Sequence, residues 1–350
     1  MGVFMKKKIL SLGILFILIT MLLVLTGCGN NTTSQNSDGN NKNNAVSKVS
    51  ILDNMKSVAQ QQLDNMFNYN FEGWTQEIQN GMTETVQDTT KQTSGVFKFE
   101  ENENTYYYYR GNVENNYVEF AGYYWRIIRT NADETIRMIY AGTSLDSSGE
   151  DIAIGTTKYN VSTSNLNMTG YTYDGNDSKV KTYLETWYKE NIENTEYDKY
   201  VATQTYVSDS TRSEEEFISA IRIRYNAHDA DVANPTLAKS KTTESYGGNY
   251  ESKVGLLTVD EALMAGLNQV SGEGAVDTYL SATTGSQKLF WTMSPLDEYG
   301  KAYVYTIGGQ IYSAPVDNER AVRPVISLNS DALNNMVGDG TKENPYKIVK

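Results

Sequence analysis

The chain has 350 residues, of which 39% are hydrophobic, 11% aromatic and 21% charged, a composition typical of a soluble folded domain and not of a wholly disordered chain. The formal net charge of −13 disfavours nucleic acids as partners. The chain has one cysteine and one histidine, which excludes an intrachain disulfide, a Cys/His zinc cluster and an HExxH metal site. A Cys–His dyad would have to consist of Cys28 and His228.

The first 28 residues have the pattern of an export signal. Lys6–Lys8 precede an apolar run, Ile9–Leu25, and the run ends in Leu25-Thr26-Gly27-Cys28. Such a pattern predicts a secretory signal peptide, and its last four residues resemble the lipobox of bacterial lipoproteins. That resemblance implies that residues 1–27 are removed and that Cys28 carries the acyl chains (diacylglycerol, palmitate) of a membrane anchor. The alternative is an uncleaved membrane helix, for which the apolar run is short.

The lipoprotein interpretation places the rest of the chain at the cell membrane, on its extracellular face. Cleavage would remove three lysines and leave a net charge of −16. Residues 28–47 are rich in Asn, Ser, Thr and Gly, and they have too few apolar side chains to offset the entropy lost on ordering. We expect them to form a disordered tether.

Residues 48–95 have helical periodicity. Leu52, Met55 and Leu63 recur at helical spacing, and a weaker repeat runs from Trp74 to Val86. The pattern predicts a helical segment that precedes the main domain. Its apolar stripe is typical of a packing face, whereas a coiled coil would need more sustained heptads.

Residues 96–350 are expected to form the main domain. Aromatic and β-branched residues predict early strands, and a region poor in apolar runs, 141–178, predicts a long loop. Helices are expected at 180–192, with Asp177 or Ser178 as the cap, and after the capping boxes that begin at Ser213 and Thr258. The predicted strands are Val96–Phe99, Thr105–Arg110, Tyr117–Ala121, Tyr124–Arg129, Thr135–Tyr140, Val254–Leu257, Lys288–Trp291, Ala302–Ile307, Gln310–Ala314, Val322–Leu328 and Lys347–Val349.

The order of strands, then helices, then strands predicts an α+β fold. Residues 226–250 are expected to be irregular, and Gly308-Gly309 predicts a two-residue hairpin turn.

Several motifs in this domain resemble an uncharacterised family of secreted or anchored bacterial surface domains. The motifs are Tyr123–Arg129, Leu257–Ala262, Trp291–Pro295, Val322–Leu328 and Gly338–Tyr346. The C-terminal part is also similar to modules related to C-type lectins and formylglycine-generating enzymes. This similarity implies a C-type-lectin-like mixed domain in which long loops carry the binding surface.

The chain departs from both relatives at their functional residues. Formylglycine-generating enzymes use a cysteine pair, which this chain lacks, so that activity is not implied. The calcium and sugar triplets of true C-type lectins are not recognisable either. No cofactor is therefore expected, although calcium stays open, because carboxylates gather at Asp146…Asp151 and Asp174…Asp177 without the EF-hand pattern.

The same resemblance places a ligand surface near Trp291–Tyr305 and Gln310–Val316. The candidate ligand-binding residues are Asp297, Tyr299, Tyr303 and Tyr312. The 26 tyrosines suit stacking on sugars or on partner side chains. Strand composition is the alternative explanation for them, and the Tyr106–Tyr109 run and Trp291 are expected to serve the core.

No catalytic motif emerges from the sequence. Asp260-Glu261 is a tempting acid pair, but Glu261 is explained as the third residue of a capping box. His228 lacks partners for metal or nucleophile chemistry. The arginines within strand patterns, Arg126, Arg129, Arg137 and Arg323, are expected to form structural salt bridges with nearby carboxylates.

These observations predict a lipid-anchored surface protein that binds an extracellular glycan or protein without catalysis. The alternative is a cell-envelope carbohydrate hydrolase, which needs two Asp/Glu carboxyl groups about 5–10 Å apart. A third hypothesis, envelope scaffolding, would use the helices at 51–90.

Overall fold

The computed structural model describes residues 50–57, 94–101, 103–173, 175–207, 249–267, 278–281, 289–298 and 301–349. The described residues all belong to one compact unit. The signal and tether with Cys28, the predicted helix after Ser213, His228 and Tyr299 lie outside the described residues. Within the described part of the chain, no helix has the length and apolar character needed to cross a membrane.

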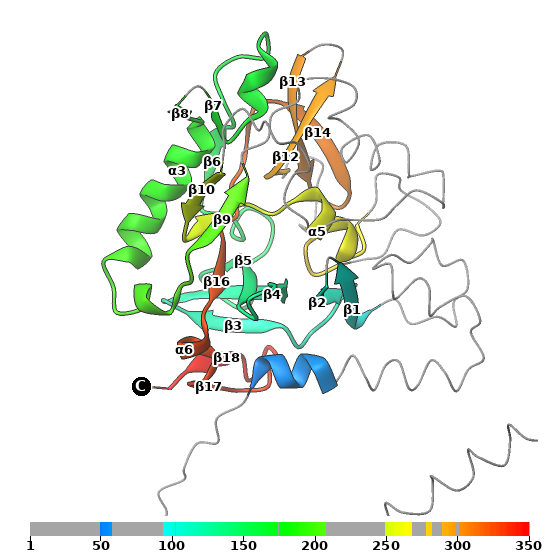
Figure 1. Cartoon of the computed structure of the whole chain (residues 1–350), viewed down its shortest axis with the longest axis vertical. Helices are drawn as coiled ribbons and strands as arrows, with labels where there is room; N and C mark the ends of the chain where they lie inside the picture. Colours follow the sequence, from blue (N-terminus) through cyan, green and yellow to red (C-terminus); the bar gives the residue numbers. More distant parts are fainter. Residues whose placement is uncertain are drawn as a thin grey trace, which may run out of the picture. The chain divides into compact units, whose positions relative to one another are not determined.

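Most of the described secondary structure is β-sheet, which confirms the α+β prediction. The strands pair mainly antiparallel, and among the described strands only β12–β15 and β18–β3 run parallel. The larger sheet has the order β11-β16-β5-β4-β3-β18-β17, and β2 joins β4 to β1 (Figure 1). Its strands are β1 (Gly95–Glu101), β2 (Asn104–Arg110), β3 (Tyr117–Phe120), β4 (Tyr123–Thr130), β5 (Ile136–Gly142), β11 (Val254–Gly255), β16 (Val325–Leu328), β17 (Met336–Val337) and β18 (Tyr346–Ile348).

The second sheet has the order β14-β13-β12-β15-β6, and two further strand pairs are β7–β8 and β9–β10. The bounds are β6 (Thr156–Lys158), β7 (Thr172–Tyr173), β8 (Asn176–Asp177), β9 (Gln204–Val207), β10 (Asn249–Ser252), β12 (Phe290–Glu298), β13 (Lys301–Ile307), β14 (Ile311–Pro315) and β15 (Glu319–Ala321). The helices are α3 (Lys179–Tyr188), α5 (Val259–Met264) and α6 (Ser330–Leu333), with short turns η2 (Leu166–Thr169), η3 (Lys189–Glu193) and η4 (Asp198–Tyr200).

Local sequence explains several boundaries. Ser178 caps α3 by accepting a hydrogen bond from the Lys181 amide, as predicted. The β3–β4 hairpin turns at Ala121 and Gly122, whose φ angles of 55° and 80° are those of a type I′ turn. The β13–β14 hairpin differs from the prediction, because Ile307 pairs with Ile311 and the loop has three residues. Asn249–Ser252 is also a strand, although irregular structure was predicted up to residue 250.

One core cluster joins both sheets. Trp125 of β4 and Trp291 of β12 are completely buried in it, which confirms the core prediction for Trp291. The helix at 51–57 contributes Ile51 and Met55 to the same core. The Asn54 amide of this helix donates to the Tyr346 hydroxyl of β18, so the helix lies against the C-terminal strands (Figure 1).

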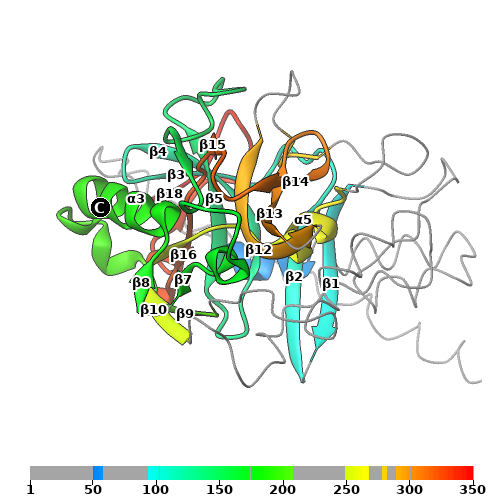
Figure 2. The same ribbon diagram turned by 90° about the horizontal axis from the view of Figure 1, so that it is seen from above.

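The segment around α5 connects the two sheets. β11 pairs with β16 of the larger sheet, and the chain then passes through Leu256 and Leu257, which are completely buried. The Met293 amide of β12 donates to the Leu257 carbonyl, and the Ser294 hydroxyl accepts from the Val259 amide. Helix α5 therefore begins between the sheets (Figure 1; Figure 2 gives the view from above), and the residues of its first turn are buried.

Candidate functional site

The capping box predicted at Thr258 is present. The Thr258 hydroxyl accepts from the Glu261 amide at 3.2 Å, and the Glu261 carboxylate accepts from the Thr258 amide at 2.9 Å. This pairing satisfies two backbone donors that the first turn of a helix leaves open. The Glu261 side chain is fully buried, and the same carboxylate also forms ion pairs in the interior.

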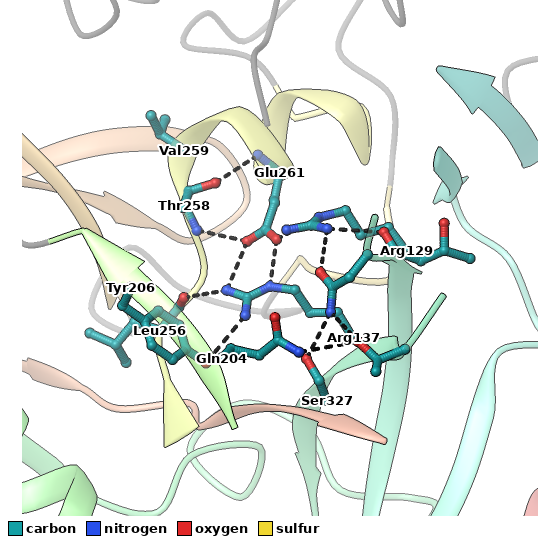
Figure 3. Close-up of polar contacts among 12 residues, drawn as sticks. Arg129, Arg137, Gln204, Tyr206, Leu256, Thr258, Val259, Glu261 and Ser327 are labelled. Atoms are coloured by element: carbon teal, nitrogen blue, oxygen red, sulfur yellow. Dashed lines mark hydrogen bonds and ion pairs between the residues drawn. The ribbon is translucent and has the colours of Figure 1, made fainter. Parts of the chain in front are cut away.

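The partners in these ion pairs are two arginines on neighbouring strands. Arg129 of β4 and Arg137 of β5 are directly opposite each other in the register. Like charges in this position repel across a sheet. Oε1 of Glu261 accepts from Nε of both arginines, at 2.8 Å from Arg129 and 2.5 Å from Arg137 (Figure 3). One carboxylate thus compensates a pair of facing cations.

The hydrogen-bonding capacity of this carboxylate is fully used. Oε1 accepts the two Nε donors, while Oε2 accepts the Thr258 amide and Nη2 of Arg137. A carboxylate has about four lone-pair sites. We call Glu261, Arg129, Arg137 and Thr258 the Glu261 cluster.

Further contacts hold the arginines of the Glu261 cluster in place. Arg137 donates to the Leu256 carbonyl and to the Tyr206 hydroxyl. Arg129 donates to the Asn131 side chain, whose amide in turn donates to the Ser327 hydroxyl of β16 (Figure 3). The network therefore connects β4, β5, β9, β16 and α5.

Electrostatics keep Glu261 ionised. Burial alone would raise its pKa, but the charges of Arg137 and Arg129, with hydrogen bonds from Arg137 and the Thr258 amide, lower the pKa to about 2. The charge of Glu261 raises the pKa of Arg137 against the opposing effect of burial. At neutral pH Glu261 is therefore ionised, and its lone pairs accept from the two arginines and the Thr258 amide, an arrangement that compensates buried charge.

The prediction of carboxylate partners for buried arginines is confirmed for Arg129 and Arg137 and wrong for Arg126 and Arg323. Arg126 donates to the Asn116 side chain and the Val113 carbonyl. Arg323 donates to the carbonyls of Tyr140 and Leu280. The chain has 43 acidic residues, but few of them are buried in the described part of the chain. Arg126 and Arg323 therefore donate mainly to backbone carbonyls and not to carboxylates.

The predicted ligand-binding residues lie on the second sheet. Asp297 pairs with Ala302 in the β12–β13 ladder. Tyr303 is opposite Leu296 and Pro315 and is packed against the core, whereas Tyr312 is opposite Thr306 and 41% exposed. Because Tyr303 and Thr306 are three positions apart on one strand, Tyr303 and Tyr312 lie on opposite faces of this sheet.

Another group of aromatic side chains reaches the surface beside α3. Tyr123, Trp125, Tyr140 and Trp187 form this aromatic cluster, with ring centroids 5.5 Å apart for Tyr123–Trp187 and 5.8 Å for Tyr140–Trp187. Trp125 is completely buried, whereas Tyr123 and Trp187 are half-buried. The cluster extends from the core to the surface.

A side-chain amide accompanies the exposed edge of the aromatic cluster. The Tyr123 hydroxyl donates to Oδ1 of Asn191 at 2.7 Å, and the Asn191 amide donates to the Trp187 carbonyl. Sequence reasoning predicted a helix over this segment but did not single out Asn191. The spacing of four residues between Trp187 and Asn191 was the available signal, but the partner Tyr123 comes from a distant strand.

Metal ligands do not converge in the described part of the chain: no three Asp, Glu, His or Cys side chains gather there as a metal site requires. Calcium binding therefore stays a prediction without a located site. Comparison of the chain with family models, with curated proteins and with solved structures returns no match.

Proposed function

We propose that this protein is a lipid-anchored surface protein whose domain binds an extracellular glycan or protein ligand without catalysis. The observation that carries the proposal is the exposed edge of the aromatic cluster, where Tyr123 and Trp187 are half-buried next to the Asn191 amide. Aromatic faces stack on sugar rings and on partner side chains, and an amide offers both a donor and an acceptor.

The electrostatics of Glu261 support the non-catalytic part of the proposal. A carbohydrate hydrolase needs a carboxyl group that keeps its proton near neutral pH. The pKa of Glu261 is instead lowered to about 2 by its two arginines. The hydrolase alternative would have to use other carboxylates.

We also propose that the domain is C-type-lectin-like. The support is a mixed α+β unit in which long segments with little regular structure, such as 143–155 and 159–171, extend from the two sheets. This arrangement suits binding surfaces on loops that a rigid scaffold positions.

The membrane anchor is tested with cells grown on a fatty-acid probe. We expect Cys28 to become labelled and the protein to fractionate with membranes. The variant Cys28→Ser should lose the label and leave the membrane. An unlabelled wild-type protein, or a variant that stays equally membrane-bound, would contradict the anchor.

Ligand binding is tested separately on an array of glycans and extracellular-matrix proteins, probed with a chain that begins at residue 29. We expect a retained ligand, and Trp187→Ala should weaken its binding by about tenfold, as truncation of a contact aromatic does. The variant Tyr312→Ala reports on the surface predicted from sequence, and unfolding midpoints show whether both variants are folded. An array that retains no ligand contradicts the proposal, and cleavage of a retained glycan would favour the hydrolase instead.

A further inference from the structure

The interior of the described unit holds more positive than negative charge around Tyr279. Arg126 and Arg323 are 8% and 2% exposed, and among the described residues neither forms an ion pair with a carboxylate. Buried charges require compensation. The chain as a whole carries −13, so this local excess of cations is not a consequence of composition.

Arg126 is held by neutral groups. Its guanidinium donates to Oδ1 of Asn116 and to the Val113 carbonyl, and it lies 3.8 Å from the ring centroid of Tyr117. The exposed Glu114 acts on it only through space. These hydrogen bonds use two of the five N–H groups of the Arg126 guanidinium.

Arg323 is also held by neutral groups. Its three hydrogen bonds go to the carbonyls of Tyr140 and Leu280, and its guanidinium lies 4.9 Å from the Phe290 ring centroid. Burial and the nearby charge of Arg126 lower the pKa of Arg323 to about 9. Arg323 therefore keeps its proton at neutral pH, and burial lowers the pKa of Arg126 as well.

The Tyr279 hydroxyl has no hydrogen-bond partner in the described part of the structure, and burial and the charge of Glu261 raise its pKa while the charges of Arg126 and Arg323 lower it. Tyr279 is 7% exposed, its hydroxyl is buried and unsatisfied, and its ring centroid lies 5.4 Å from Cζ of Arg126. The position is well anchored, because the Tyr279 amide donates to the Gly111 carbonyl and Arg323 donates to the adjacent Leu280 carbonyl. An unused buried donor costs stability unless a ligand satisfies it.

We propose that Arg126, Arg323 and the Tyr279 hydroxyl form an internal binding site for a small oxyanion such as phosphate, sulfate or a carboxylate. Guanidinium groups bind oxyanions through charge-assisted hydrogen bonds, and the phenol adds a third donor. Because all three groups are in the interior, the occupant is a small free ion and not a group on a large ligand. This proposal does not depend on the proposed function, although Arg323 donates to the backbone carbonyl of Tyr140, a member of the aromatic cluster.

The test measures thermal unfolding of the full-length protein by tryptophan fluorescence during titration with phosphate, sulfate or acetate, against chloride at matched ionic strength. We expect at least one oxyanion to raise the unfolding midpoint with saturation. The variant Tyr279→Phe keeps the ring and should raise the half-saturating concentration by about tenfold, because one hydrogen bond to a charged ligand is lost. Without oxyanion, the same variant should be as stable as wild type or more so.

Tyr159→Phe is the matched control. Tyr159 is also completely buried with an unsatisfied hydroxyl, but burial is the only effect on its pKa, so no arginine acts on it. Its variant should respond to oxyanions as wild type does, which separates site binding from the general stabilising effect of phosphate and sulfate. The proposal is overturned if no oxyanion gives a saturable rise, or if Tyr279→Phe and Tyr159→Phe respond alike.

Discussion

The Glu261 side chain has two structural roles. It completes the capping box of α5, and its negative charge compensates the facing positive charges of Arg129 and Arg137. The capping box depends on four consecutive residues, whereas the two arginines come from strands more than a hundred residues away in the sequence. Removal of the negative charge would leave the buried Arg137 facing the largely buried Arg129 without compensation, so its effect depends mainly on the second role.

We expect Glu261→Gln to lower the free energy of unfolding by about 3–5 kcal/mol, since it leaves uncompensated buried charges. Denaturant unfolding followed by tryptophan fluorescence measures this loss. The control is Glu134→Gln, because Glu134 is 69% exposed in its 3.3 Å ion pair with Lys56. The control should change stability by less than about 1 kcal/mol, and an equal loss in both variants would contradict the role assigned to Glu261.

Acid should remove the contribution of Glu261. Its pKa is about 2 in the folded protein, against 4.5 for a glutamate side chain that is free in water. A lowered folded-state pKa stabilises the fold above the unfolded value, and the stabilisation disappears as the pH falls from 4.5 towards 2. We expect the stability difference between wild type and Glu261→Gln to be constant from pH 7 to about 5 and to shrink by on the order of 3 kcal/mol at pH 2. A difference that does not change with pH would show that Glu261 is not ionised in the fold.

At the scale of elements, glycines with the same backbone angle differ in what surrounds them. Gly122 in the β3–β4 turn and Gly340 in the tail before β18 both have φ +80°. A Cβ at Gly122 would meet nothing within 4 Å, whereas a Cβ at Gly340 would collide with the Asn115 carbonyl oxygen and the Tyr346 ring. Gly340 also accepts from the Tyr117 amide at 2.8 Å, so it joins the tail to β3.

We expect Gly122→Ala to cost about 1–2 kcal/mol, the penalty for a side chain at positive φ. Gly340→Ala should cost about 1–3 kcal/mol more, because a backbone atom cannot move aside as a flexible side chain can. Chemical denaturation of the two variants measures the difference, and the identical φ makes one the control for the other. Equal costs would indicate that the tail adjusts freely.

The elements themselves were largely predictable. Alternation and aromatic content located the strands from β1 to β5, and capping residues located α3 and α5. The β13–β14 loop was predicted one residue too short, because Gly308-Gly309 contains the usual turn residues while the actual pairing continues only from Ile311. The pairing of distant strands, such as β18 with β3, leaves no local signal.

At the scale of the molecule, the helix at 51–57 belongs to the same compact unit as the sheets. The periodicity predicted a packing face that includes Leu52 and Met55; this is confirmed for Met55, which packs in the core together with Ile51. Met55 is completely buried, whereas Leu52, one turn earlier, is half-buried.

We therefore expect Met55→Ala to destabilise the whole sheet unit by about 2–5 kcal/mol, in one cooperative transition. Leu52→Ala changes the same helix with a smaller loss of buried surface, and it serves as the control for altered helix content. Equilibrium unfolding monitored by tryptophan fluorescence and by far-ultraviolet circular dichroism checks both points. Separate transitions in the two signals would mean that the helix folds independently of the sheets.

The sequence by itself determined what short-range chemistry can specify: the periodicity of the strands, the caps of α3 and α5, the exclusion of disulfide and zinc chemistry, and the predicted anchor at Cys28. Each of these depends on residues within a few positions of one another or on composition. The tertiary structure alone decided which buried arginines obtain a carboxylate, because Arg129 and Arg137 reach Glu261 while Arg126 and Arg323 do not. Compensation of buried charge depends on distances of a few ångströms between remote segments, and no local pattern encodes those distances.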